Sequence, residues 1–264
     1  MLTFPFSCPG CENATVADIV FLIDGSSSVS SDSFRLVQAF IRNIIKDLNI
    51  GPQKVRVGVA QYSDDPHKEF LLKDHMDRRS LQTAVDRIRH RGGSTQTGRA
   101  MDFLRTDFFT TQAGSRANQR VPQIAVVITD GESSDDVVVP ARRLRQHGVI
   151  VFGIGVGETI NLQELEDIAN LPRDRFLLTI DHYDALEREK DRLLKTVCGS
   201  VQYEKEGKSR DWWGRLFVYF AIEYKNNYPR KTFLSNTFSF PQRNIPTFGL
   251  PCLVSVLMLW NSDG

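Results

Sequence analysis

Two aspartates and a group of hydroxyl side chains are the residues of this sequence whose types and spacing favour chemistry. Asp24 and Asp130 each end an apolar run, DIVFLID and IAVVITD, and each is followed by glycine. Ser26 and Ser28 follow Asp24 at alternate positions, and residues 92–98 form a hydroxyl-rich segment, GGSTQTG. Carboxylates and hydroxyls without a thiol or an imidazole form a hard-oxygen ligand set, which favours Mg²⁺ or Mn²⁺ and disfavours Zn²⁺ or copper. These residues therefore predict a divalent-metal site.

The elements that must position these residues are predicted by the alternation of apolar runs and helical patterns. This alternation is typical of an α/β fold with a doubly wound, Rossmann-like, mostly parallel six-stranded sheet and helices on both faces. In such a sheet the first strand and the first strand of the second half lie side by side, and ligands bind beyond their carboxyl ends. Asp24 and Asp130 are therefore expected to face each other across one crevice, with residues 92–98 at the same rim.

The predicted elements have approximate bounds set by apolar spacing. We expect strands at 18–24, 55–59, 70–72 (an edge strand), 124–130, 149–156 and 175–180. We expect helices at 34–48, 81–88, 101–108, up to His147, 162–169 and 186–197. Ser31 and Asp32 are candidate caps of the first helix, and Gly148 is placed to end the fourth. Gly153 and Gly155 lie within a strand and not in a first strand-to-helix turn, so they predict close helix approach and not a dinucleotide site.

The metal-site residues, in the pattern Asp24-x-Ser26-x-Ser28, then Thr95, then Asp130, resemble the metal-ion-dependent adhesion site of the von Willebrand factor A domain. The resemblance covers about residues 17–199, and the segments DIVFLIDGSSSV, VAQYS and VFGIGVG are similar to A domains of collagen VI alpha chains and matrilins. It implies that the serines bind the ion directly and that the other three bind directly or through water. Thr97 fits equally on spacing alone, and the family pattern favours Thr95.

The family also implies a function, which is to bind an acidic side chain of a matrix protein, such as a collagen or another A-domain protein, at the open metal position. This predicts a non-enzymatic adhesion or assembly module. An alternative is a metal-independent assembly module. A less favoured alternative is a serine hydrolase using Ser26 or Ser28 with Asp130 and His182, in a loop that lacks the second glycine of a nucleophile elbow.

Composition sets limits on other functions and predicts two regions. The net charge of +1 argues against nucleic-acid binding, and no segment has the roughly 18 to 20 apolar residues of a membrane-spanning helix. The last 64 residues contain half of the aromatic residues and all three tryptophans. We therefore expect an N-terminal segment at 1–16, an A domain at 17–200 and a divergent, loosely packed tail at 201–264, with the boundary near Tyr203 to Asp211.

Cysteines border the predicted domain, and a bridge from Cys8 or Cys11 to Cys198 would tie its ends together. Such a bridge implies an oxidising compartment, and Asn13 begins a glycosylation sequon that agrees with secretion into the extracellular matrix. Alternatives for Cys8 and Cys11 are a redox pair or half of a zinc site. Residues 1–10 lack the pattern of a signal peptide, so we expect either a fragment of a larger secreted chain or a protein that is not exported.

Overall fold

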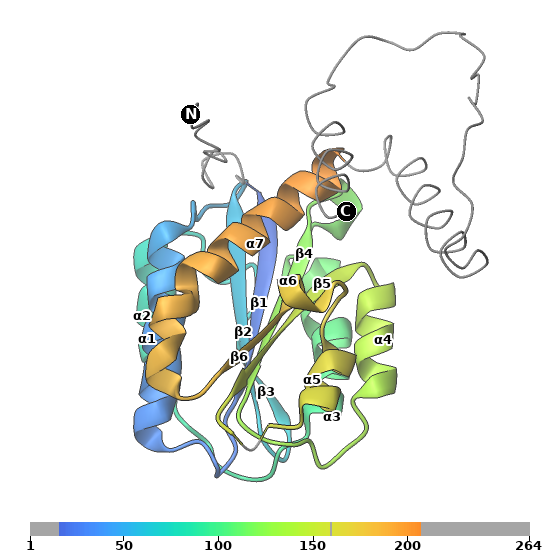
Figure 1. The fold of residues 1–264 in the computed structure, drawn as a ribbon. Helices are drawn as coiled ribbons and strands as arrows, with labels where there is room; N and C mark the ends of the chain where they lie inside the picture. The colour runs from blue at the N-terminus through green and yellow to red at the C-terminus, as the bar shows by residue number, and fades with distance from the viewer. Residues whose placement is uncertain (1–15, 159, 207–264) are drawn as a thin grey trace, which may run out of the picture. The chain divides into compact units, whose positions relative to one another are not determined.

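The computed structural model describes residues 16–158 and 160–206, and within them a six-stranded sheet is the centre of the fold (Figure 1). The strand order is β3-β2-β1-β4-β5-β6, and only β3 is antiparallel to its neighbour. The strands are β1 (Ala17–Asp24), β2 (Val55–Tyr62), β3 (Pro66–Phe70), β4 (Gln123–Thr129), β5 (Val149–Val156) and β6 (Leu177–Ile180). The prediction of a doubly wound, mostly parallel six-stranded sheet is confirmed.

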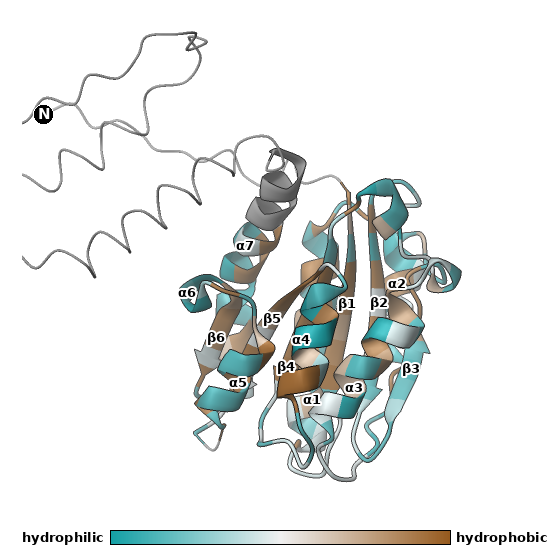
Figure 2. Ribbon diagram, turned by 90° about the vertical axis from the view of Figure 1, so that its right-hand side faces the viewer, coloured by the Kyte–Doolittle hydropathy of each residue, from teal (hydrophilic) through white to brown (hydrophobic). Residues whose placement is uncertain are grey.

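Helices cover both faces of this sheet (Figure 2). One hydrophobic cluster joins the sheet to α1 (Ser31–Asp47), α2 (Arg78–Asp86) and α7 (Leu186–Glu206). A second cluster joins the other face to α3 (Thr97–Phe103), α4 (Val138–Gln146) and α5 (Leu162–Ile168), and a short helix, α6 (Arg173–Phe176), precedes β6. No helix among the described residues is long and apolar enough to span a membrane.

Strand β1 lies in the middle of the sheet and is buried along its whole length. Its side chains alternate between the two clusters, with Ile19 and Phe21 in the first and Val20 and Leu22 in the second. A strand covered on both faces needs apolar residues at successive positions, which explains the uninterrupted run in the sequence. Because β1 pairs with β2 and β4 in parallel, the carboxyl ends of all three strands meet at one edge of the sheet.

The glycines of β5 have the role that the sequence predicts, which is to admit a helix close to the sheet. A Cβ atom on Gly153 would lie 3.0 Å from Leu165 Cδ1, and one on Gly155 would lie 2.8 Å from Leu165 Cδ2. Both distances are too short for ordinary packing, so α5 can occupy its position only because these residues lack side chains.

Most predicted boundaries differ from the structure by one or more residues; β2, for example, continues past residue 59 to Tyr62, and α2 covers Arg78–Asp86 instead of 81–88. Four of the differences have identifiable local reasons. Helix α1 is capped by Ser30, whose side chain accepts from the backbone N–H of Ser33, and not by Ser31 or Asp32. The edge strand β3 ends at Phe70, because the next N–H turns to the Asp74 carboxylate. Two further boundaries move with helix ends. Helix α6 follows Pro172 and occupies Arg173–Phe176, so β6 begins at Leu177 and not at 175. The helix expected at 101–108 begins at Thr97, is α-helical only to Phe103 and is π-helical at Leu104–Phe108.

The last helix and the terminal segments bear on the predicted domain limits. Helix α7 continues through residue 200 to Glu206, and Cys198 lies within it. The division of the chain at residue 200 stays a prediction. Cys8, Cys11, Asn13 and most of the predicted tail lie outside the described residues, so the bridge and the glycosylation site stay predictions as well.

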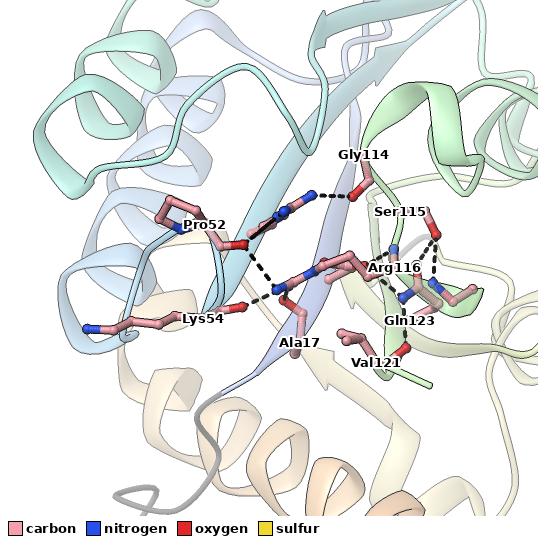
Figure 3. Close-up of polar contacts among 11 residues, drawn as sticks. Ala17, Pro52, Lys54, Gly114, Ser115, Arg116, Val121 and Gln123 are labelled. Atoms are coloured by element: carbon pink, nitrogen blue, oxygen red, sulfur yellow. Dashed lines mark hydrogen bonds and ion pairs between the residues drawn. The ribbon is translucent and has the colours of Figure 1, made fainter. Parts of the chain in front are cut away.

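A buried ion pair between Arg116 and Asp18 lies at the amino end of β1, opposite the edge where the carboxyl ends meet (Figure 3). The guanidinium of Arg116 donates to Asp18 Oδ1 at 2.6 Å and 2.9 Å, and the backbone N–H of the same residue donates to Asp18 Oδ2 at 2.7 Å. Arg116 also donates to the carbonyl oxygens of Ala17 and Lys54, and Gln123 donates to Asp18 Oδ2. These bonds join β1 to the start of β4 and to the loop before β2.

We predict that Arg116→Met lowers the free energy of unfolding by about 3–5 kcal/mol, because it leaves the fully buried Asp18 carboxylate without its cation. Urea denaturation of the full chain measures this loss. Arg35→Met is the matched control, since its ion pair with Asp32 is largely exposed and is expected to contribute less than about 1 kcal/mol. Equal losses in the two variants would contradict the assignment.

Candidate metal centre

The expected ligands lie where β1 and β4 end side by side. Asp24 is the last residue of β1, and Asp130 follows the last residue of β4. The loop after β1 is tied to the glycine-rich loop before α3 by the Ser27 N–H, which donates to the Gly93 carbonyl at 2.9 Å, and by the Gly93 N–H, which donates to Ser27 Oγ at 2.9 Å. Backbone bonding thus fixes the loops relative to each other before any ligand is bound.

Four of the five predicted ligands form a continuous chain of polar contacts. The Ser26 N–H donates to Asp24 Oδ1 at 2.9 Å, and Ser26 Oγ lies 2.9 Å from Ser28 Oγ. Ser28 Oγ in turn donates to Asp130 Oδ1 at 2.7 Å. The structure therefore brings both carboxylates and both serine hydroxyls together, as the sequence predicts.

The two threonines of the glycine-rich loop have different environments. Thr97 is fully buried, and its hydroxyl donates to the Tyr62 phenol at 3.3 Å, which commits it to the interior. Thr95 is half-buried, and its carbonyl oxygen accepts from the Ser134 N–H at 2.7 Å. Among the described residues the Thr95 hydroxyl has no hydrogen-bond partner, and it makes no hydrogen bond to the other four predicted ligands. Its side chain is thus the one of the two that is available to an ion.

A layer of neutral hydroxyls under the site is not apparent from the sequence. The Tyr62 phenol donates to Asp24 Oδ2 at 3.4 Å, and the Thr129 hydroxyl donates to the same oxygen at 3.0 Å. Tyr62 is opposite Asp24 in the β1–β2 register, so the signal that would have found it is the pairing of these strands. Burial, and then the Asp24 charge, raise the pKa of Tyr62 well above its ordinary value. Tyr62 therefore stays a neutral donor.

A second tyrosine, Tyr183, approaches from the segment between β6 and α7. Burial, and then the charges of Asp130 and Asp24, raise the pKa of its phenol. The ring packs against the hydrophobic cluster that includes α1 and α7. The segment before the last helix thus brings a neutral phenol into the field of the two predicted carboxylate ligands, and nothing in the local sequence around residue 183 indicates it.

The electrostatic state of Asp24 distinguishes the site from an ordinary polar rim. Its side chain is buried, with 3% of the residue exposed, and no Lys or Arg of the described chain forms an ion pair with it. Burial raises the pKa of Asp24, hydrogen bonds from Ser26 lower it, and the charge of Asp130 raises it further. A buried carboxylate without a cation is costly, and a divalent ion supplies the missing charge. The residues present therefore fit a metal.

The donor set also limits which kind of centre this can be. Within the described ranges no three His, Cys, Asp or Glu side chains cluster as a metal site, so the centre has two carboxylates supplemented by hydroxyls. The alternative of a serine hydrolase requires an imidazole bonded to Ser26 or Ser28, and the hydrogen bonds of the described residues do not supply one. Neither serine hydroxyl is bonded to an imidazole of the described chain, and His90 Nε2 lies 3.1 Å from the carbonyl oxygen of Ser26, not from its hydroxyl.

Comparison with known proteins gives one family and two groups of relatives. Residues 18–192 match the model of the von Willebrand factor type A domain. The chain is 38% identical over 214 residues to mouse collagen alpha-4(VI) chain, covering 80% of this chain and 9% of that one. It is 37% identical over 182 residues to human collagen alpha-6(VI) chain, covering 69% and 8%. The chain thus spans less than a tenth of either collagen.

Solved structures of proximal thread matrix protein 1 from the mussel byssus share the fold. One has a TM-score of 0.64 and 26% identity, covering 72% of this chain and 47% of that one. Another, with a zinc occupied MIDAS motif, has a TM-score of 0.66 and 24% identity, covering 70% and 48%. At this identity the second likeness concerns the fold alone.

The contrast between the two buried aspartates of β1 gives a test. In metal-free buffer we expect Asp24→Asn to leave the free energy of unfolding unchanged or higher, because it removes an uncompensated buried charge. Asp18→Asn, the matched control in the same strand, should lower it by about 3 kcal/mol or more, because it leaves Arg116 buried without its partner.

The raised pKa of Asp24 adds a pH dependence to this test. In the folded state its carboxyl keeps a proton at a pH where the unfolded chain has released it, so the metal-free protein gains stability as the pH falls through the folded pKa. Urea midpoints measured across the acidic range should show this gain in the parent protein and not in Asp24→Asn. A parallel pH profile in both proteins would contradict the assignment.

Proposed function

The chain belongs to the von Willebrand factor type A domain family, and on that premise we propose that it is a non-enzymatic adhesion or assembly module of the extracellular matrix that binds partners through a divalent metal. The observation that carries the proposal is the buried Asp24 carboxylate, which has hydroxyl groups around it and no ion pair with a Lys or Arg of the part of the chain that the structure describes. Collagens are matrix proteins, so the similarity to collagen VI chains supports an extracellular location.

The metal proposed is Mg²⁺ or Mn²⁺, held by the oxygen atoms of Asp24, Ser26, Ser28, Thr95 and Asp130. Ser28 donates its one proton to Asp130, so in the contact between the two serines it is Ser26 that donates to Ser28, and one lone pair of the Ser28 oxygen remains available to a cation. The zinc occupied motif in the byssus protein supports the view that this fold can hold a divalent ion.

Partner binding follows from the low charge of this donor set. When bound, the ion supplies an open coordination position that accepts a carboxylate from outside the domain. The protein's own contribution is to hold Asp24 in place through Ser26, Tyr62 and Thr129 without adding further negative charge. The partners proposed are matrix proteins such as collagens or other A-domain proteins.

Metal binding is tested by calorimetric titration of the full chain with Mg²⁺ and with Mn²⁺. We expect one site, lost in Asp130→Ala and in Ser28→Ala, since both remove oxygens of the contact chain. Asp32→Ala is the control, because this aspartate is exposed and pairs with Arg35. At an ion concentration about 100 times the dissociation constant, the parent protein should gain about 2.7 kcal/mol in unfolding free energy. Unchanged affinity in both site variants would refute the ligand assignment.

Adhesion is tested by binding of the full chain to immobilised collagen with Mg²⁺ and with a chelator. We expect binding that the chelator abolishes and that Asp130→Ala lacks in the presence of Mg²⁺. Chelator-resistant binding by both proteins would instead support the alternative of metal-independent assembly. If metal binds but no collagen does, the metal centre stands and the partner class is wrong.

A further inference from the structure

A groove lies at the β3 end of the sheet, between β3 and α2, which are on the same side of the domain (Figure 2). The groove there has a volume of about 660 Å³, and none of the five predicted metal ligands lines it. Its floor is apolar, since Phe70 and Ile88 are buried residues that line it. His75 packs edge-on against Phe70, with ring centroids 5.1 Å apart.

The basic and acidic side chains of the groove differ in whether they have partners within the described chain. Arg79 and Arg87 line it and are exposed, and neither forms an ion pair within the described chain. The two acidic residues beside them have local partners. Glu69 accepts from Gln61 at 3.1 Å and from Arg91 at 3.4 Å.

Asp77, the second of these acids, is committed to the start of α2. Its carboxylate accepts the Ser80 N–H at 2.9 Å, and this capping contact lowers the pKa of Asp77. The groove therefore presents two free guanidinium groups above an apolar floor, while its carboxylates are occupied.

The spacing of the two arginines selects the kind of ligand. They are eight positions apart on α2 and its cap, which corresponds to about 12 Å along a helix. Alternate residues of an extended peptide face the same side, so residues four apart face one way and lie about 13 Å apart. An acidic residue at each of these positions would reach Arg79 and Arg87, and the residue midway would lie over the groove between them, level with Thr83 and Ala84, which line it.

We propose that this groove binds an extended segment of a protein partner in which two acidic residues, four positions apart, flank a central apolar residue. Guanidinium groups suit carboxylates because they offer paired N–H donors in one plane. A continuous polyanion fits less well, because a run of phosphates or sulfates would bring negative charge along the whole groove, past Glu69 and Asp77, whereas the proposed segment brings it only to the two arginines. The surface is additional to the proposed metal-dependent one.

The test uses the full chain and the labelled peptide Ser-Glu-Ser-Val-Ser-Glu-Ser, with binding followed by fluorescence anisotropy in the presence of a chelator. We expect binding that persists without metal and weakens at least tenfold in the double variant Arg79→Glu, Arg87→Glu. Arg142→Glu is the matched control, because this arginine is also exposed on a helix and forms no ion pair among the described residues. The control should bind as the parent protein does.

Two further arms separate the outcomes. A peptide with its glutamates adjacent has the same charge, and its binding should be weaker because only one arginine is within reach. Absence of binding to the parent protein, or equal binding of the two peptides, would overturn the proposal. Binding that requires Mg²⁺ and is lost in Asp130→Ala would also overturn it, because the peptide would then occupy the metal centre. Circular dichroism of each variant shows that the fold is retained.

Discussion

Strand β1 buries a carboxylate at each of its ends, Asp18 at the start and Asp24 at the last position. The strand is covered on both faces, so neither Asp18 nor Asp24 can be solvated by bulk water. At the start of the strand the chain supplies its own cation, Arg116, which reaches Asp18 from the segment before β4. At the other end no such cation is present in the described chain, and hydroxyl groups take its place. One end therefore fixes the sheet, and the other is suited to an exchangeable ion.

The surroundings of the two carboxylates, at the start and at the end of β1, could be predicted only in part from the sequence. Long apolar runs that end in Asp-Gly identify β1 and β4, because a strand buried on both faces is apolar at successive positions and so stands out in the sequence. Their adjacency follows from the strand order of a doubly wound sheet, in which the first strands of the two halves are neighbours. The pairing of Asp18 with Arg116 could not be predicted, since the partners are far apart in sequence and the arginine lies in an irregular loop.

The Tyr62 and Thr129 hydroxyls, which donate to Asp24, could not be predicted from the sequence for a related reason. Tyr62 supports Asp24 because the two residues pair across β1 and β2, and a shift of one residue would turn the phenol to the opposite face. Apolar alternation establishes that β2 exists, but not its register. The ends of strands and helices differ from the predicted ones for another reason. Each is set by a single hydrogen bond from the backbone to a side chain, such as that of Ser30 or Asp74. The position of such an end does not change which apolar residues are buried in the core, so the apolar pattern does not indicate it.

The proposed metal centre and the proposed β3–α2 groove would recognise the same chemical group, a carboxylate, by different means. At the metal centre the positive charge is brought by an ion, and neutral donors such as Tyr62 and Thr129 hold the buried carboxylate without increasing the negative charge that the ion must offset. In the groove the charge belongs to the chain, as Arg79 and Arg87. A carboxylate on the ion requires free divalent metal, whereas one on the guanidiniums is weakened chiefly by salt, because both arginines are exposed. A domain with both surfaces can therefore hold an acidic partner when divalent metal is scarce, and can add a second contact when the metal is present.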